Sequence, residues 1–322
     1  MHLTVSNTSD FSILSATPRW QQLQHPLLRR HNTELWLCHL TTAIAAVSGN
    51  KCLKLKHHLA QAKAEGKLGI VTFGGAFSNH LSAVAATCNA LNLQSKAYIR
   101  TDQLDLSNPT LQFCAKQGMQ FLPLDRASYR QKSNPEFIAQ VATSHPDFFL
   151  VPEGGSSLQG ARGVAELDLV ATPAGPANLL VSAVASGGTL AGMINRQAAP
   201  VLGIAVVKDA SLVQRVQQFL QPASEKCPWH IDMEHTFGGY ARFDVTLLDF
   251  CRAMAVQQVF VEPIYTGKAL YGLFQRIEQG KIAAGSRISF FHTGGLQGLN
   301  GLYYRKLISA ADLVQLSGSG AG

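Results

Sequence analysis

The 322-residue chain has few charged residues and no long run of apolar ones. Charged residues make up 15% of the chain and apolar ones 46%, a balance that excludes wholesale disorder. The longest apolar stretches, such as 179–185, fall far short of the ~18 residues needed to span a bilayer. The N-terminus lacks the basic stretch and apolar core of a secretory signal. We therefore expect a soluble, cytoplasmic protein of about two domains that does not bind a membrane.

The chain also lacks the residue spacings of disulfide frameworks, metal sites and nucleic-acid modules. Its six cysteines form no CxxC pair and its eleven histidines no HExxH motif, so we expect buried free thiols and no metal site. The net charge of +7 comes from scattered basic residues. An anionic small ligand explains that charge as well as nucleic acid does, and no nucleic-acid partner is expected.

Common nucleotide and hydrolase motifs are missing. The segment 187–192 has the wrong spacing for a dinucleotide-binding GxGxxG, and Glu262 stands where a P-loop ending at Lys268 needs glycine. No GxSxG nucleophile motif occurs.

From residue 67 onward, short apolar segments alternate with helical patterns such as 79–91. The predicted strands are 68–73, 96–100, 119–124, 148–151, 178–184, 201–207 and 287–292. Apolar strands separated by helices are typical of parallel sheets covered by helices, so we predict an α/β fold. The tail 317–322 has the composition of a flexible linker and is predicted to be disordered.

Five Gly-Gly pairs punctuate this pattern, and four of them follow a predicted strand and precede a helix. They stand at 74–75, 154–155, 187–188, 238–239 and 294–295. A single pair is explained as well by a tight turn. Because the carboxyl ends of parallel strands share one edge, the pairs together predict a ligand cleft there.

Lys51 falls in the first turn of a helix predicted to begin after Ser48–Asn50 and to end near Gly66. The positive end of the helix dipole disfavours the charged form of an ammonium group there. A neutral amine in that place can form a Schiff base with a carbonyl cofactor. An ordinary exposed lysine is the alternative, and this observation alone favours it.

Two further loops are candidates for ligand binding. Backbone amides of Gly187, Gly188 and Thr189, with the hydroxyls of Ser186 and Thr189, can hold a phosphate at a helix start, although a plain turn is possible. Ser78 and Asn79 stand at another helix start, where their side chains either cap the helix or bind a ligand.

In this order, the segments resemble the 1-aminocyclopropane-1-carboxylate deaminase and D-cysteine desulfhydrase family. The resemblance runs from about residue 15 to 305 through the motifs GNKxxKL at 49–55, GGxxSNH at 74–80, PEGGSSxxGARG at 152–163, SGGTxAG at 186–192, GGYA at 238–241, EPIYTGKALYG at 262–272 and HTGG at 292–295. It implies pyridoxal phosphate (PLP) as cofactor and the two-domain fold of the tryptophan synthase β subunit. The smaller domain would be 52–153, the larger one 1–51 with 154–322, and the protein a homodimer.

The resemblance also implies roles for individual residues. Lys51 would bind PLP as a Schiff base and later remove the substrate's α-proton, and Asn79 would contact the phenolic oxygen of the cofactor. Lys54 would bind the phosphate together with the loop Ala185, Ser186, Gly187, Gly188, Thr189 and Leu190. The substrate-binding residues would be Ser78, Asn79, His80 and Phe77, and Ser78 would also be catalytic. Of the catalytic tyrosines Tyr240 and Tyr265, one would pack against the substrate and the other assist proton or nucleophile chemistry, in an order that the sequence leaves open.

The ring nitrogen of the cofactor would meet Thr266 or Thr293. The family's deaminases carry glutamate where this chain has Thr266, and a hydroxyl does not enforce protonation of the ring, so the electron sink is weaker. β-Elimination needs less from that sink than opening a cyclopropane does. We therefore predict a lyase that acts on a small amino acid, D-cysteine or a related β-substituted alanine, and converts D-cysteine to pyruvate, sulfide and ammonia. The alternatives are a 1-aminocyclopropane-1-carboxylate deaminase that forms 2-oxobutanoate, and a non-catalytic protein that binds PLP or an amino acid.

Phe77 stands where members of the family usually carry glutamine. This difference leaves the side-chain preference for the substrate open.

Overall fold

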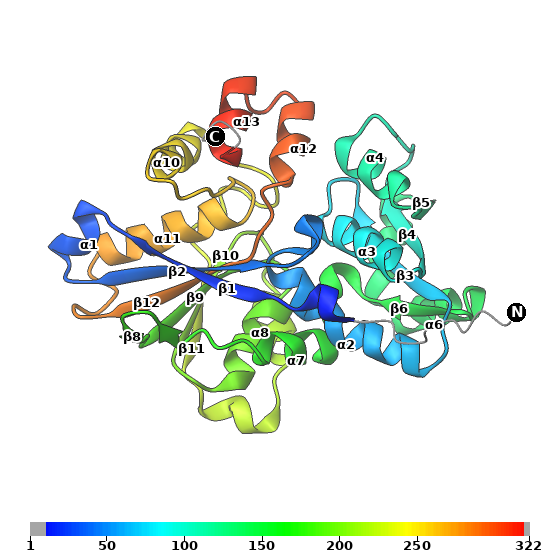
Figure 1. Cartoon of the computed structure of the whole chain (residues 1–322), viewed down its shortest axis with the longest axis horizontal. Coiled ribbons are helices and arrows are strands. Elements are labelled where there is room, and N and C mark those ends of the chain that lie inside the picture. Colours follow the sequence, from blue (N-terminus) through cyan, green and yellow to red (C-terminus); the bar gives the residue numbers. More distant parts are fainter. Residues whose placement is uncertain (1–10, 319–322) are drawn as a thin grey trace, which may run out of the picture.

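The computed structural model describes residues 11–318, which form two large β-sheets flanked by helices and one small two-stranded sheet (Figure 1). All seven predicted strands are present: β3 (Gly69–Gly75), β4 (Gln94–Arg100), β5 (Gln120–Leu124), β6 (Phe148–Val151), β9 (Leu179–Val184), β10 (Val201–Ala205) and β12 (Arg287–His292). Their pairings with one another are all parallel, which confirms the predicted α/β class.

The larger sheet also contains strands that the sequence pattern did not reveal: β1 (Thr17–Leu23), β2 (Glu34–Thr41) and β11 (Trp229–Asp232). Its order is β1-β2-β12-β9-β10-β11, and β1 pairs antiparallel with β2, so this sheet is mixed rather than wholly parallel. The edge strand β1 is mostly exposed and lacks the apolar run that marks the buried strands. Two strands of two residues each, β7 (Ala171–Thr172) and β8 (Gly175–Pro176), pair antiparallel in a separate small sheet.

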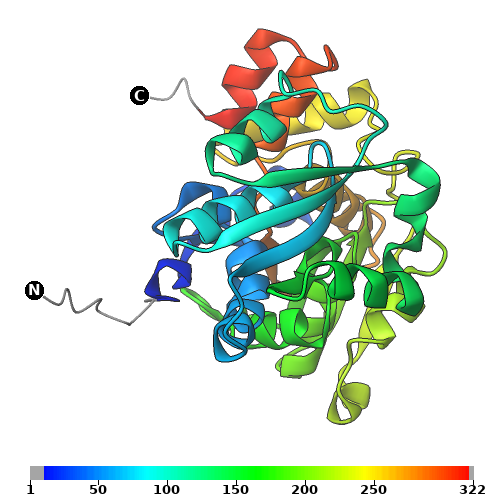
Figure 2. The ribbon, with the colours of Figure 1, turned by 90° about the vertical axis from the view of Figure 1, so that its right-hand side faces the viewer.

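The smaller sheet is all parallel, in the order β5-β4-β3-β6, and forms a lobe beside the larger sheet (Figures 1 and 2). Strand β3 is buried on both faces, which explains its continuous apolar sequence. Ile70 belongs to the core that contains α3 (Asn79–Ala90), whereas Val71 and Phe73 pack with Tyr129 and Val141 on the other side. The helix predicted at 79–91 is confirmed as α3.

Strand β9 divides the larger lobe in the same way. Leu180 packs in the core of α7 (Leu158–Ala165) and α8 (Gly188–Arg196), and Val181 packs in the core of α10 (Val245–Val256) and α11 (Thr266–Glu278). Figure 1 shows these two helix pairs on opposite faces of the sheet. The first core also includes α2 (Asn50–Ala64) and α3, so it joins the two lobes.

The remaining helices lie at the ends and edges of the sheets. They are α1 (Pro26–Arg30), α4 (Pro109–Lys116), α5 (Arg126–Tyr129), α6 (Pro135–Ser144), α9 (Leu212–Gln217), α12 (Gly298–Tyr304) and α13 (Ala310–Ser317), with 3-10 turns η1 (Phe11–Leu14), η2 (Ala45–Val47), η3 (Arg130–Ser133), η4 (Glu153–Gly155) and η5 (Pro222–Lys226). The strands of the smaller sheet fall within 52–153 and those of the larger sheet outside it. The proposed domain division at these residues stays a prediction.

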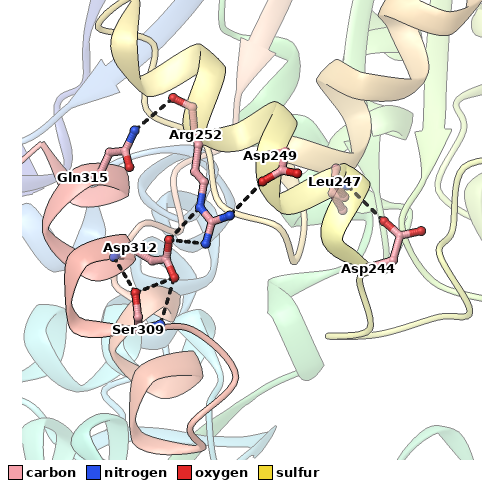
Figure 3. A network of polar contacts seen from close by, with 7 residues as sticks. All are labelled: Asp244, Leu247, Asp249, Arg252, Ser309, Asp312 and Gln315. Carbon is pink, nitrogen blue, oxygen red and sulfur yellow. Dashed lines mark hydrogen bonds and ion pairs between the residues drawn. The ribbon is translucent and has the colours of Figure 1, made fainter.

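The last described helix, α13, is tied to α10 by an ion pair (Figure 3). Nε of Arg252 donates to Asp312 at 2.7 Å, and Asp312 forms a capping box with Ser309 at the start of α13. Ser317 ends this helix and Gly318 caps it with φ +72°, so the start of the predicted disordered tail is corrected: these two residues are ordered. Residues 319–322 lie outside the described part of the chain.

All six cysteines are buried and free, as predicted. Between residues 11 and 318, no helix is long and apolar enough to cross a membrane.

Candidate active site

A cavity of about 720 Å³ lies where the carboxyl edges of the two sheets face each other. Each of the five Gly-Gly pairs contributes to its wall, through Gly75, Gly154, Gly187, Gly238 with Gly239, and Gly294 with Gly295. The cleft that the glycine pairs predict is therefore present. It takes side chains from both lobes.

Lys51 reaches this cavity from the first turn of α2. The helix starts after Gly49, whose φ is +87°, and a Cβ atom at Gly49 would lie 2.3 Å from the carbonyl oxygen of Thr293. Nζ of Lys51 donates to Oδ1 of Asn50 at 2.8 Å, and Nδ2 of Asn50 donates to Oγ1 of Thr189 at 2.9 Å. Asn50, which the sequence suggested only as part of a turn, links the lysine to the start of α8. Its place in the GNK motif was the available signal.

Burial lowers the pKa of Lys51 to about 8. The sequence led us to expect a lowered pKa from the helix dipole, whereas desolvation is the main cause in the structure. A lysine with this pKa has a substantial neutral fraction near physiological pH. Lys51 can therefore act as a nucleophile toward a carbonyl group.

The loop before α8 has the features of a phosphate site. Gly187 is the N-cap residue with φ +87°, and no side chain caps the helix, so its first amide groups are available to a ligand. Ala185, Ser186, Gly187, Thr189 and Leu190 line the cavity. Gly188 instead lies against Ser156, whose Oγ would be 3.0 Å from a Cβ atom at Gly188.

Lys54 does not line the cavity but reaches it through two hydroxyl groups. Its side chain is 1% exposed, and Nζ donates to Oγ of Ser156 at 2.7 Å. Oγ of Ser156 donates in turn to Oγ of Ser186, a lining residue, at 2.6 Å. Burial lowers the pKa of Lys54 well below its ordinary value, and an anion bound at the loop would favour the charged form. Sequence reasoning missed Ser156, although it belongs to the motif at 152–163.

At the start of α3, Ser78, Asn79 and His80 line the cavity. Ser78 is the N-cap residue, yet its hydroxyl makes no capping hydrogen bond. The hydroxyl and the helix start therefore remain available to a substrate carboxylate. Nδ2 of Asn79 would lie 3.0 Å from a Cβ atom at Gly295, so the glycine leaves room for this amide.

His80 is held as a neutral side chain by strand β3. Oγ1 of Thr72 donates to the carbonyl oxygen of Val151 at 2.7 Å, so it accepts from Nε2 of His80 at 2.8 Å. Burial lowers the pKa of His80 well below its ordinary value. His80 therefore orients the start of α3 and carries no charge into the cavity.

Phe77 does not line the cavity, although the sequence placed it beside the substrate. Its ring packs against α12, where a Cβ atom at Gly301 would lie 2.6 Å from Cδ1. The rings of Phe77 and Tyr304 have their centroids 6.2 Å apart, and the guanidinium group of Arg305 lies 5.7 Å from the Phe77 ring centroid. The apolar ring thus joins α12 to the loop before α3.

Tyr240 and Tyr265 both line the cavity, and their ring centroids are 5.9 Å apart. Tyr240 is 42% exposed, and the partial loss of solvent raises the pKa of its phenol; burial raises the pKa of the Tyr265 phenol as well. Both side chains are therefore protonated at physiological pH and can donate hydrogen bonds.

The two threonines predicted at the ring nitrogen differ in position. Thr293 lines the cavity, whereas Thr266 is fully buried behind it and donates its hydroxyl to Glu262 at 3.0 Å. The Glu262 carboxylate also accepts from the amides of Ile264 and Tyr265, at 2.6 and 3.0 Å. Burial raises the pKa of Glu262 to about 7. Glu262, to which the sequence analysis gave no role although it begins the motif at 262–272, holds the turn that presents Tyr265.

These features define an enzyme that uses a phosphorylated carbonyl cofactor on a small carboxylate substrate. The buried amine of low pKa fits the carbonyl group, and the uncapped start of α8, with its serine hydroxyls and the lysine behind them, fits the phosphate. The second helix start, at α3, fits the substrate carboxylate.

The sequence profile of the family described as "Pyridoxal-phosphate dependent enzyme" matches residues 24–294. The chain belongs to this family, and pyridoxal phosphate is its cofactor.

Individual relatives agree with this assignment. A putative 1-aminocyclopropane-1-carboxylate deaminase of Pyrococcus abyssi is 26% identical, covering 79% of this chain and 82% of its own. A bifunctional D-cysteine desulfhydrase/1-aminocyclopropane-1-carboxylate deaminase of Arabidopsis thaliana is 28% identical, covering 88% of this chain and 77% of its own. A crystal structure described as an ACC deaminase homologue shares the fold, with a TM-score of 0.76 and 22% identity over 92% of this chain and 94% of its own.

Proposed function

We propose that this chain catalyses the PLP-dependent β-elimination of a small amino acid, with D-cysteine giving pyruvate, sulfide and ammonia. The observation that carries the choice of reaction is that a threonine, Thr293, lines the cavity where the ring nitrogen of the cofactor is expected, while the lining carboxylates of Glu153 and Asp209 pair with Lys132 and Arg215. Thr266 and Glu262 do not line the cavity and bond to each other. Elimination of a thiolate, a good leaving group, needs a weaker electron sink than opening a cyclopropane does. The name of the Arabidopsis relative includes both activities, so the cyclopropane deaminase is the second candidate.

PLP, when bound, supplies the electron sink that stabilises negative charge at Cα of the substrate. In this proposal Lys51 would hold the cofactor through Nζ, and its amine, when displaced by the amino group of the substrate, would take the proton from Cα. Asn50 holds that amine, as Oδ1 accepts from Nζ in the structure. The low pKa of Lys51 supports both roles, because a charged ammonium group can neither attack a carbonyl nor accept a proton.

The other residues bind and orient. The amides at the start of α8, together with Ser186 and the Lys54–Ser156 pair behind it, hold the phosphate. Asn79 contacts the phenolic oxygen, and the hydroxyl of Ser78 with the amides of α3 binds the substrate carboxylate. The protonated phenols of Tyr240 and Tyr265 enclose the side chain of the substrate, where a phenol can hydrogen-bond to the leaving sulfur.

The test combines turnover with mapping of the cofactor. Purified protein is reduced with borohydride and digested, and we expect the pyridoxyl label on the Lys51 peptide. Pyruvate and sulfide should form from D-cysteine in the wild type and not in Lys51→Ala. Pyruvate release by Lys51→Ala would refute the assignment. Steady 2-oxobutanoate formation from 1-aminocyclopropane-1-carboxylate would favour the deaminase, and a labelled protein that turns over neither compound would favour a binding protein.

We also propose, from the family resemblance, a cytoplasmic homodimer with the domain division at 51/52 and 153/154. Sedimentation velocity tests the dimer, and a monomer at every concentration would refute it.

A further inference from the structure

The wall of the active-site cavity carries more positive than negative charge. Besides Lys51, the charged side chains that line it are Arg100, Lys132, Lys208, Arg215, Arg242, Glu153 and Asp209. Five cations therefore face two anions.

Both anions already have partners within the cavity wall. Glu153 accepts from the hydroxyl of Tyr129 at 2.6 Å and pairs with Lys132 at 3.5 Å. Asp209 pairs with Arg215 and also accepts from the amide of Ser211 at 2.9 Å. Within residues 11–318, Arg100, Lys208 and Arg242 have no acidic partner.

The unpaired cations come from both lobes and lie beside the substrate-binding segments. Arg100 ends β4 and pairs in register with Gly75, and its Nη2 would be 3.6 Å from a Cβ atom there, at the start of the loop to Ser78. Arg242 and Lys208 flank the loop of Tyr240: Cδ of Arg242 would be 3.5 Å from a Cβ atom at Gly238, and Cβ of Lys208 3.6 Å from one at Gly239.

Arg100 and Tyr240 line the same cavity from different lobes. Burial raises the pKa of the Tyr240 phenol, and the charge of Arg100 opposes that shift.

The other anionic groups expected in the cavity have their own partners. The cofactor phosphate has the start of α8 with Lys54, Ser156 and Ser186, and the substrate α-carboxylate has Ser78 with the start of α3. Among the described residues, Lys208 and Arg242 in the cavity wall have no acidic partner, nor has Arg100, whose guanidinium group lies 5.8 Å from the Tyr129 ring centroid, so these cations can recognise a further anion.

We propose that the substrate carries a second anionic group, a phosphate or carboxylate, on its side chain, and that Arg100 and Arg242 bind this group. The inference rests on the proposed β-elimination. It replaces D-cysteine, which carries no second phosphate or carboxylate, by an anionic β-substituted alanine as the preferred substrate of the same site. Arginine suits the role because its planar fork of N–H donors matches both groups.

O-Phosphoserine is a reactive probe of this class. Lys51 takes the Cα proton, a double bond forms between Cα and Cβ, and the Cβ–O bond breaks with its electron pair leaving on phosphate. Water then hydrolyses the resulting enamine, so one O-phosphoserine and one water give pyruvate, ammonia and inorganic phosphate.

The first measurement is binding to the holoenzyme, read from its visible absorption as each enantiomer of four amino acids is titrated. Aspartate is compared with asparagine, and O-phosphoserine with serine, so each anionic ligand has a neutral partner of similar shape. We expect at least one anionic ligand to bind about 10- to 100-fold more tightly than the neutral amino acid of similar shape. This ratio is the size expected when the neutral ligand lacks one charge-assisted hydrogen bond. Equal affinities within both pairs would overturn the proposal.

The second measurement uses Arg100→Gln and Arg242→Gln, with Arg126→Gln as a matched control for an exposed arginine outside the cavity. The two cavity variants should lose most of the preference for the anionic ligand and leave the dissociation constant of PLP within about threefold of wild type, while the control keeps the preference. Weaker PLP binding by the cavity variants, with the preference intact, would assign these cations to the cofactor instead. Absence of turnover of every amino acid would count against the proposed elimination, whereas the binding comparison still decides the charge preference.

Discussion

The pKa of Lys51 permits a direct test of the active-site environment. The perturbation is a change of pH from 6.5 to 10.5 in protein from which PLP has been removed with hydroxylamine. Burial lowers the pKa of Lys51 from 10.5 to about 8, so the neutral form should rise through pH 8. At pH 8 about half of the Lys51 side chains are neutral, against roughly 0.3% of lysines at the ordinary value. This is a difference on the order of 150-fold in reactive amine.

The assay is reductive methylation with a short exposure to formaldehyde and cyanoborohydride, followed by peptide mass spectrometry. The rate at Lys51, normalised to its own plateau at high pH, should be half-maximal near pH 8. Asn50→Leu removes the acceptor that lies 2.8 Å from Nζ and stabilises the charged form, so the midpoint should move to still lower pH. A wild-type midpoint at pH 10 or above would refute the argument from burial. An upward movement in Asn50→Leu would refute the role given to the amide.

Three further predictions concern stability, measured as the free energy of unfolding in urea. Gly49→Ala should cost roughly 3 kcal/mol or more because a Cβ atom would meet a backbone carbonyl oxygen at 2.3 Å. Gly66→Ala, with φ +65° and no atom within 4 Å of the added Cβ, should cost about 1 kcal/mol. Equal losses would contradict the packing argument. Burial raises the pKa of Glu262 from 4.5 to about 7, so the native state binds a proton at this carboxyl more tightly than the unfolded state does. The protonated carboxyl therefore adds to the free energy of unfolding below pH 4.5, and this stabilisation is lost as the pH rises through 7. The wild type should thus lose about 3 kcal/mol more than Glu262→Gln between pH 4.5 and 7.5, and parallel curves would exclude this assignment. Lys268→Met removes an ammonium group that donates to three carbonyl oxygens at 2.6 to 3.3 Å, two of them in the loop before Tyr240. We expect a loss of about 3 kcal/mol and faster proteolysis in 236–240, and an unchanged digestion pattern would argue against this role of Lys268.

The buried parallel strands were predictable because each is a short apolar run between helices, and β3 and β9 are buried on both faces. The antiparallel edge was not predictable in the same way. Strand β1 alternates little and is mostly exposed, so its position depends on pairing with β2 rather than on its own pattern. The residues of β1 and its immediate neighbours do not indicate which strand it will pair with.

The order of the motifs along the chain determined the family, the cofactor and the lysine that we propose to bind it. Glycine pairs at strand ends also determined that a cleft exists, because parallel strands bring their carboxyl ends to one edge. The motif order and the positions of the glycine pairs depend only on residue type and spacing, so both can be identified from the sequence alone.

Only the tertiary structure decided which side chains face the cleft. Thr266 and Thr293 are both threonines in motifs of the family, yet one is turned into the protein against Glu262 and the other lines the cavity. Phe77 packs on α12, and Lys54 reaches the cavity through Ser156 and Ser186. The direction of a side chain depends on packing between elements far apart in the sequence, and neighbouring residues alone do not specify it.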